Sequence, residues 1–224
     1  MTFLRPLSNK YLAGMIDHAL LKADATQKEI GKLCRQARKC GFASVCVNPG
    51  YVSLASKLLS NSRVKVCTVV GFPLGATTST VKIVEATQAI TDGADEIDAV
   101  INIGQLKSGN YQVVLDEIKA IRAATRGKIL KVILETLYLT KDEIIKVSQM
   151  SKDAGADFIK TSTGFGPSGA TIKDIQIIRR AVGLSMGIKA AGGIRTRQEM
   201  IKMIEAGATR IGTSNSVAIV EGKM

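Results

Sequence analysis

Short apolar runs alternate with longer amphipathic stretches along the whole chain. Eight runs rich in Val, Ile and Ala have the length of single strands and lie at 16–21, 44–47, 65–70, 96–102, 130–135, 158–161, 187–190 and 210–212. The stretches between them carry apolar residues three and four positions apart, as at 79–91 and 111–123, which is the spacing of an amphipathic helix. The pattern therefore predicts strands and helices in alternation.

A Gly-Ala-Asp or Gly-Ala-Thr tripeptide recurs at 93–95, 155–157 and 207–209, each time between a helical stretch and a strand. Glycine is common just past the end of a helix, so each copy marks a passage from helix to strand. Eight such units without a long linker predict an α/β fold with one domain, a (β/α)8 TIM barrel over residues 1–224. The alternative is an open doubly wound sheet, but its Gly-x-Gly-x-x-Gly loop is not found after an early strand.

Composition narrows the class of protein. Trp is absent and aromatic residues make up 4%, so the core must consist of aliphatic side chains, as in a parallel sheet covered by helices. We expect a cytoplasmic protein with reduced thiols and no membrane contact, because no signal peptide or long apolar run occurs. One histidine and no Cys-x-x-Cys pair make a metal site unexpected.

The chain carries a net charge of +12. Its Lys and Arg residues are spread out and share helical stretches with acids, as in Lys141-Asp142-Glu143. This indicates a solvated basic surface that would also attract an anionic small substrate. No basic patch rich in aromatic residues points to a nucleic-acid partner.

Two predicted strands each carry one lysine in an otherwise apolar run, Lys160 and Lys189. Because strand residues alternate faces, Ile159 and Ile188 would face the helices while both lysines face the barrel axis. Burial and a second positive charge nearby both lower the pKa of a lysine, and a neutral amine is what an imine-forming nucleophile needs. The competing interpretations are a lysine that extends from the strand end to solvent and a lysine paired with a carboxylate. The presence of two lysines on neighbouring strands favours catalysis.

The fourth predicted strand has one apolar face, made by residues 97, 99 and 101. The other face, with Glu96, Asp98, Val100 and Asn102, should point inward. Asp98 could pair with a lysine and relay protons, whereas a purely structural salt bridge is the favoured interpretation of Glu96.

Other polar residues in the strands could support such a site. Asp17 and His18 lie in the first strand, and Glu135 and Thr136 end the fifth. His18 is more easily explained as a histidine of the core.

Glycine-containing loops follow the last two predicted strands: Ala191-Gly192-Gly193-Ile194-Arg195 and Gly212-Thr213-Ser214-Asn215. Glycine lets backbone amides approach an anion, and each loop opens a helix whose N-terminus favours negative charge. Many barrels bind phosphate with the loops after strands seven and eight. We expect a phosphate site here, the alternative being two tight turns that bind nothing.

Seven ordered motifs resemble the deoxyribose-phosphate aldolase family of class I aldolases, and together they span nearly the whole chain. They are Ile16-Asp17-His18, Val45-Cys46-Val47-Asn48-Pro49, Val70-Gly71-Phe72-Pro73-Leu74-Gly75, Asp95-Glu96-Ile97-Asp98, Lys160-Thr161-Ser162-Thr163-Gly164-Phe165, Lys189-Ala190-Ala191-Gly192-Gly193-Ile194-Arg195 and Arg210-Ile211-Gly212-Thr213-Ser214. The resemblance implies a (β/α)8 lyase that reversibly cleaves 2-deoxy-D-ribose 5-phosphate to acetaldehyde and D-glyceraldehyde 3-phosphate, in deoxyribose phosphate catabolism.

The resemblance also implies roles for individual residues. Lys160 would form the imine, Lys189 would depress its pKa and take part in proton transfer, and Asp98 would relay protons through water, with Asp17 and Thr163 in support. The phosphate-binding residues implied are Gly164, Gly192, Gly193, Ser214 and Asn215. No metal or organic cofactor is implied, because the protonated imine is itself the electron sink, and a homodimer or homotetramer is expected.

Five features depart from the family pattern. Ala19 stands where a hydroxyl residue is usual, Asn215-Ser216 replaces Ser-Gly or Ser-Ser, Leu137 replaces a common cysteine, Ser168 replaces a glycine, and no tyrosine follows Tyr138. The first two predict weaker substrate affinity or a shift toward another aldehyde. Two alternatives therefore stay open: another lysine-dependent aldolase with a different acceptor, and a non-catalytic barrel that binds a phosphorylated metabolite.

Overall fold

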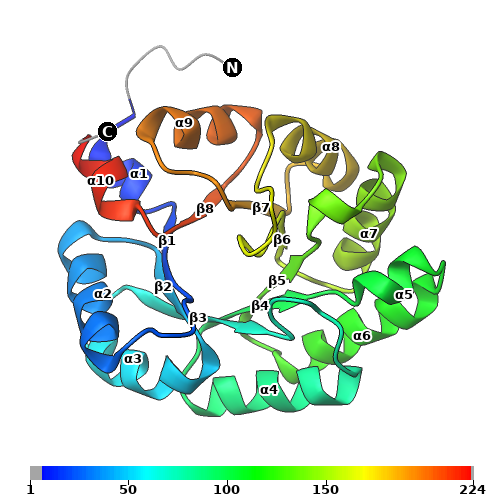
Figure 1. Cartoon of the computed structure of the whole chain (residues 1–224), viewed down its shortest axis with the longest axis horizontal. Coiled ribbons are helices and arrows are strands. Elements are labelled where there is room, and N and C mark those ends of the chain that lie inside the picture. The colour runs from blue at the N-terminus through cyan, green and yellow to red at the C-terminus, as the bar shows by residue number, and fades with distance from the viewer. Residues whose placement is uncertain (1–6, 223–224) are drawn as a thin grey trace.

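Eight parallel strands close into a barrel at the centre of the molecule (Figure 1). The computed structural model describes residues 7–222. Each strand pairs in parallel with the next, and β1 pairs with β8 to complete the ring. The strands are β1 (Ile16–Leu20), β2 (Ser44–Val47), β3 (Lys65–Val70), β4 (Glu96–Val100), β5 (Ile129–Ile133), β6 (Phe158–Lys160), β7 (Gly187–Ala191) and β8 (Arg210–Thr213).

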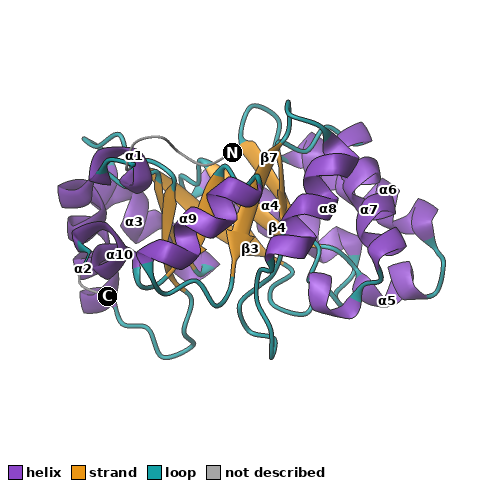
Figure 2. Ribbon diagram, turned by 90° about the horizontal axis from the view of Figure 1, so that it is seen from above, coloured by secondary structure: helices purple, strands orange, loops and turns teal. Residues whose placement is uncertain are grey.

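Helices surround the strands, which lie between them when the molecule is turned by 90° (Figure 2). Several helices begin at a threonine whose hydroxyl accepts a backbone N–H, and Thr26, Thr140 and Thr196 form full capping boxes with a glutamate three residues later. The α-helices are α1 (Asn9–Ala13), α2 (Gln27–Cys40), α3 (Val52–Leu59), α4 (Ser79–Thr91), α5 (Ile103–Lys107), α6 (Tyr111–Ala124), α7 (Lys141–Asp153), α8 (Ile172–Val182), α9 (Arg197–Ala206) and α10 (Ser216–Glu221), and two 3₁₀ turns are η1 (Pro49–Tyr51) and η2 (Thr136–Tyr138).

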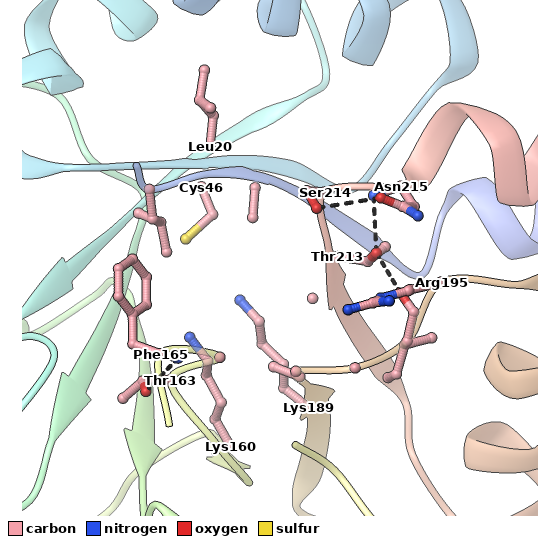
Figure 3. A pocket seen from close by; sticks show the side chains of 18 of the residues that line it. Leu20, Cys46, Lys160, Thr163, Phe165, Lys189, Arg195, Thr213, Ser214 and Asn215 are labelled. Atoms are coloured by element: carbon pink, nitrogen blue, oxygen red, sulfur yellow. Dashed lines mark hydrogen bonds between the residues drawn. The ribbon is translucent and has the colours of Figure 1, made fainter. Parts of the chain in front are cut away.

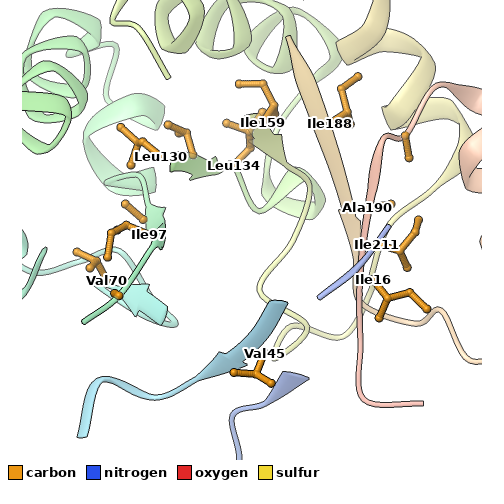
Figure 4. Packing of buried hydrophobic residues seen from close by; sticks show 14 of the residues in the cluster. Ile16, Val45, Val70, Ile97, Leu130, Leu134, Ile159, Ile188, Ala190 and Ile211 are labelled. Atoms are coloured by element: carbon orange, nitrogen blue, oxygen red, sulfur yellow. The ribbon is translucent and has the colours of Figure 1, made fainter. Parts of the chain in front are cut away.

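The main hydrophobic core lies between the barrel and its helices. Aliphatic side chains on the outer faces of the strands fill this layer, among them Val45, Ile97, Ile159 and Ile188 (Figure 4). Because the alternate residues of the same strands point inward, the barrel interior receives the polar side chains. The predicted orientation of Lys160 and Lys189 follows from this arrangement.

The closed barrel confirms the predicted fold and shows the open doubly wound sheet to be wrong. Two predicted strands end two residues earlier than expected. β4 ends at Val100, and Asn102 is the N-cap of α5, where its side chain accepts the N–H of Gln105 at 3.1 Å. Asn102 therefore does not belong to the inward face of β4. β5 ends at Ile133, and Glu135 adopts a left-handed conformation in the turn that follows.

Within residues 7–222, none of the helices combines the length and the apolar character needed to cross a membrane. The four cysteines are all free thiols, and Cys34, Cys46 and Cys67 are buried.

Candidate active site

A pocket of about 350 Å³ opens at the carboxyl end of the barrel (Figure 3). Its walls come from the segments that follow β1, β6, β7 and β8, which is where a TIM barrel carries its chemistry. Its lining includes Ala19, Lys22, Cys46, Lys160, Thr163, Gly164, Phe165, Lys189, Gly192, Gly193, Arg195, Gly212, Ser214 and Asn215.

Lys160 and Lys189 point into this pocket from adjacent strands (Figure 3). They are register partners on β6 and β7, so their side chains leave the barrel wall at the same height. Both are almost fully buried. Each ammonium group donates to the same oxygen, Oδ2 of Asp98, at 3.0 Å from Lys160 and 2.7 Å from Lys189. The structure thus brings together the three residues predicted to carry catalysis.

The ammonium groups of the two lysines differ in their partners. Lys189 also lies 2.5 Å from Oδ2 of Asp17, so two carboxylates hold it. Asp98 is the one carboxylate within 4 Å of the Lys160 amine among the described residues, and the Phe72 ring centre lies 5.9 Å away. The more loosely held amine is therefore Lys160.

Sequence reasoning did not find the deeper part of this charge cluster. Lys131 on β5 is fully buried and lies 2.8 Å from Asp98 and 2.5 Å from Glu96. Arg210 on β8 lies 2.7 Å from Asp17 and 3.5 Å from Glu96. Glu96 thus takes part in a buried salt bridge, which is the role that the sequence favoured for it. The signal for Lys131 was present, because it too is a single lysine inside an apolar strand.

The pKa of Lys189 is raised, whereas the sequence led us to expect that burial and a neighbouring lysine would lower it. Burial lowers the pKa of Lys189, but the charges of Asp17 and Asp98 outweigh burial and raise it above the ordinary value. Burial opposes ionisation of Asp98, yet Lys131, Lys160 and Lys189 hold the pKa of its carboxyl well below the usual range. Lys189 and Asp98 are consequently charged at neutral pH.

The predicted phosphate-binding residues gather at the mouth of the pocket. Gly192, Gly193, Ser214 and Asn215 line the pocket together with Arg195, and Gly164 packs against Gly192. An added methyl group at Gly164 would lie 3.8 Å from the Cα atom of Gly192, so the two loops pack closely.

Glycine is required at 192, since its φ is +87° and the chain of Gly169 passes against it.

The supporting residues lie on different sides of the lysines. Asp17 is buried beneath the pocket, where Ser44 and Arg210 donate to its Oδ1 at 2.7 Å. Thr163 lines the pocket, and its hydroxyl donates to Glu135. His18 faces the helices, donates its Nε2–H to Oε1 of Gln36 at 3.2 Å and packs against Phe42, so it is a core residue.

Cysteine and carboxylate atoms that could hold a metal ion lie together in two buried groups, Cys46 with Cys67 and Asp98, and Cys67 with Asp17 and Glu96. The ammonium groups of Lys131 and Lys189 already lie 2.5–2.8 Å from these carboxylates. A divalent cation would have to displace them against their positive charge. The cluster is therefore better suited to holding amines than metal.

Of the family departures, only Ala19 and Asn215 line the pocket. Ser216 is buried and donates to the carbonyl oxygen of Thr213 at 3.0 Å, which fastens the loop after β8. Leu137 and Ser168 are exposed, and neither belongs to the described pocket lining.

Comparison with known proteins identifies the family of the chain. The sequence model for DeoC/LacD family aldolases matches residues 12–219. A protein of Carboxydothermus hydrogenoformans, named deoxyribose-phosphate aldolase, is 54% identical over 220 residues, with 96% of each chain covered. A Streptococcus pneumoniae protein of the same name is 56% identical over 216 residues, again with 96% of each chain covered.

Solved structures agree as well. The deoxyribose phosphate aldolase of Aeropyrum pernix, described as having a unique tetrameric structure, superimposes with a TM-score of 0.89 at 35% identity and covers 96% of this chain and 91% of its own. A paired lysine centre at the carboxyl end of a (β/α)8 barrel, together with a family match over nearly the whole length, places this chain in the DeoC/LacD family of aldolases, which are carbon–carbon lyases.

Proposed function

We propose that this aldolase reversibly cleaves 2-deoxy-D-ribose 5-phosphate to acetaldehyde and D-glyceraldehyde 3-phosphate, through an imine on Lys160. One observation carries the proposal: two lysine amines share one carboxylate oxygen inside a pocket whose mouth is built of glycine loops. The names of the relatives from Carboxydothermus hydrogenoformans and Streptococcus pneumoniae support the choice of substrate.

Lys160 is the better nucleophile because it is less firmly bound than Lys189. Its amine must give up one contact, with Asp98, before it attacks a carbonyl carbon, whereas Lys189 would leave two carboxylates. The attack forms a carbinolamine, which loses water to give the protonated imine.

Lys189 and Asp98 are suited to moving protons around that imine. The pKa of Lys189 is raised by Asp17 and Asp98, so Lys189 carries a proton that it can donate to the substrate oxygen. Asp98 contacts both amines through one oxygen and gives the proton a short route between them. Asp17 keeps Lys189 in place from below.

The mouth of the pocket suits the substrate's phosphate. Gly164, Gly192, Gly193, Ser214 and Asn215 offer backbone amides and a hydroxyl group around one opening, and the exposed side chains of Lys22 and Arg195 add positive charge. Asn215 is also the N-cap of α10. We therefore assign the phosphate of the substrate to the mouth of the pocket.

Trapping of the imine tests the proposal. Wild-type protein treated with acetaldehyde and borohydride should gain one reduced adduct, which peptide mass spectrometry should place on Lys160. Lys160→Ala and Lys160→Arg should lose the adduct and turnover, since a guanidinium group stays protonated and cannot form an imine. Lys173→Arg, at an exposed position on α8, is the matched control and should behave as wild type.

Each alternative has its own outcome in this experiment. An adduct on another lysine would refute the assignment of Lys160. Phosphate-ester binding without any adduct would favour a non-catalytic barrel. Trapping with cleavage of unphosphorylated deoxyribose alone would favour another lysine-dependent aldolase.

Two further parts of the proposal concern the setting of the enzyme. Its four unpaired thiols suit a reducing compartment such as the cytoplasm. Self-association is proposed from the tetrameric structure described for the Aeropyrum pernix relative and from an exposed apolar face on α4, where Val81 and Val84 are 51% and 63% exposed.

A further inference from the structure

The segment 161–170, directly after the imine lysine, forms one wall of the pocket. Thr163, Gly164 and Phe165 line the cavity and belong to no helix or strand. Backbone hydrogen bonds tie the two ends of the segment to β7, from Thr161 to Lys189 and from Ala170 to Ala191, both at 3.1 Å, whereas Thr163 and Phe165 lie between these ends. Gly164 has a φ of +84°, and Phe165 packs edge-on against Phe72 with ring centres 5.1 Å apart. Something outside the segment must therefore fix where its backbone amides lie.

Glu135 supplies that anchor from the turn after β5. Its Oε2 accepts the backbone N–H of Thr163 at 3.0 Å and also accepts the Thr163 hydroxyl. The Thr163 hydroxyl oxygen in turn accepts the N–H of Phe165 at 3.1 Å. One carboxyl oxygen thus fixes three consecutive residues around Gly164. Glu135 is buried and does not belong to the pocket lining, so it acts through the wall rather than on the substrate.

Keeping a glutamate at this position is costly. Glu135 is the one non-glycine residue with a positive φ, +53°, in the described part of the chain. Its Oε1 is buried and has no hydrogen-bond partner among residues 7–222. Strained backbone and unpaired buried oxygens persist mainly where function requires them. Glycine would relieve the strain, and an apolar side chain would leave no oxygen unpaired, but neither could fasten Thr163.

We propose that Glu135 is a positioning residue for phosphate recognition: it sets the position of Gly164 against Gly192 at the pocket mouth. The inference rests on the proposed function, since it assigns the phosphate to these loops. Lys160 precedes the anchored segment and is itself held by β6, where Leu134 donates its N–H to the Lys160 carbonyl oxygen at 3.0 Å. Loss of the anchor should therefore affect phosphate binding more than imine formation.

Three substitutions of Glu135 distinguish loss of the anchor from loss of folding. Glu135→Ala removes it, and Glu135→Gly removes it while relieving the positive φ, which guards against an alanine variant that does not fold. For both, KM for deoxyribose 5-phosphate should rise roughly tenfold, the effect of one charge-assisted hydrogen bond. The kcat/KM for unphosphorylated deoxyribose and the rate of borohydride trapping should stay within about twofold of wild type. Glu135→Gln keeps an acceptor for Thr163 and should restore most of the affinity.

Glu143→Ala is the matched control, because the Glu143 side chain also accepts a backbone N–H, that of Thr140 at the start of α7, and is not part of the described pocket. It should leave both substrates unaffected. Equal losses on the two substrates, slowed trapping in Glu135→Gly, or no loss at all would overturn the inference. Failure of the proposed function is distinct, since wild-type protein would then not cleave deoxyribose 5-phosphate.

Discussion

Asp98 is the residue on which the charge balance inside the barrel depends. Its two oxygens accept hydrogen bonds from Lys131, Lys160 and Lys189 at 2.7–3.0 Å. Removing one partner of a buried ion pair leaves the others uncompensated and costs about 3–5 kcal/mol. Asp98 therefore holds two reactive amines at one point and keeps the barrel interior electrically balanced. A carboxylate in this position serves stability and chemistry together.

His18 should give the stability of the protein a pH dependence of its own. Burial between β1 and α2 lowers the pKa of His18 below 6.5, although a hydrogen bond with Gln36 partly offsets this. Below about pH 6.5 the unfolded chain binds a proton that the folded chain excludes, so the free energy of unfolding falls as pH decreases. Above that pH the contribution is complete.

Urea unfolding at about pH 5 and pH 7.5 measures this effect. The difference between the two pH values should be larger for wild type than for His18→Gln, which cannot take up the proton. Equal differences in the two proteins would show that His18 does not carry the dependence.

For single residues, the sequence predicted which side chains point into the barrel, but it did not predict which charged groups they contact there. Strand alternation placed Lys160, Lys189 and Asp98 inward, because that property is local. The pKa of Lys189 depends on Asp17, which lies 172 positions earlier in the sequence and meets it only through barrel closure. Lys131 carries the same local signal as the other two strand lysines, a single lysine in an apolar run, and its partner Asp98 lies on the neighbouring strand.

Strand β8 makes room for the Lys189 side chain, because the residue next to it, Gly212, has no side chain. A methyl group at Gly212 would lie 2.9 Å from Cε of Lys189 and 3.1 Å from Cβ of Ala191. The lysine side chain therefore crosses the face of β8 at a point where only glycine leaves room. The packing of β8 against β7 therefore determines where the Lys189 amine lies.

Gly212→Ala should displace the Lys189 side chain from Asp17 and Asp98. Its φ is not positive, so alanine is tolerated by the backbone and the effect is steric. We expect kcat to fall at least about tenfold, since an error near 1 Å in a catalytic group can cost a hundredfold. Imine trapping on Lys160 should continue. Steady-state kinetics and borohydride trapping on the same preparation separate these two effects.

Gly50→Ala is the control, because an added methyl group there meets nothing within 4 Å. It should retain wild-type kcat. Wild-type kcat in Gly212→Ala as well would show that Lys189 can shift without loss of function.

The order of the elements could be predicted from the sequence, whereas some of their ends could not. Asn102 and Glu135 both continue an alternating pattern, yet Asn102 caps α5 and Glu135 turns into a left-handed conformation. Alternation cannot distinguish a strand residue from a polar residue just beyond the strand. The second of these errors concealed the anchor of the pocket wall, because Glu135 looked like the last residue of a strand.

The surface beside α4 is suited to contact between two copies of the chain. Leu74, Val81 and Val84 are 73%, 51% and 63% exposed along a groove of about 770 Å³ beside α4. The only ionisable residues in the described lining of this groove are the acids Glu85 and Asp92. On a chain with a net charge of +12, a face without exposed cations is where a second copy can approach with least repulsion. The loop between β3 and α4, which carries Leu74, also carries Phe72, and Phe72 packs against Phe165 of the active-site pocket.

Val84→Lys should therefore weaken self-association. It places a cation on the apolar face, where two symmetric copies would bring like charges together. Size-exclusion chromatography with light scattering should show an oligomer for wild type and a smaller species for the variant at equal concentration.

Leu184→Lys is the matched control, because Leu184 is 92% exposed and lies between α8 and β7, away from α4. The mass of this variant should equal that of wild type, so that added charge alone is excluded as the cause. An unchanged oligomer in Val84→Lys would place the interface elsewhere. If Val84→Lys also lowers turnover while leaving unfolding unchanged, contact between copies helps to hold Phe72 against Phe165 at the pocket.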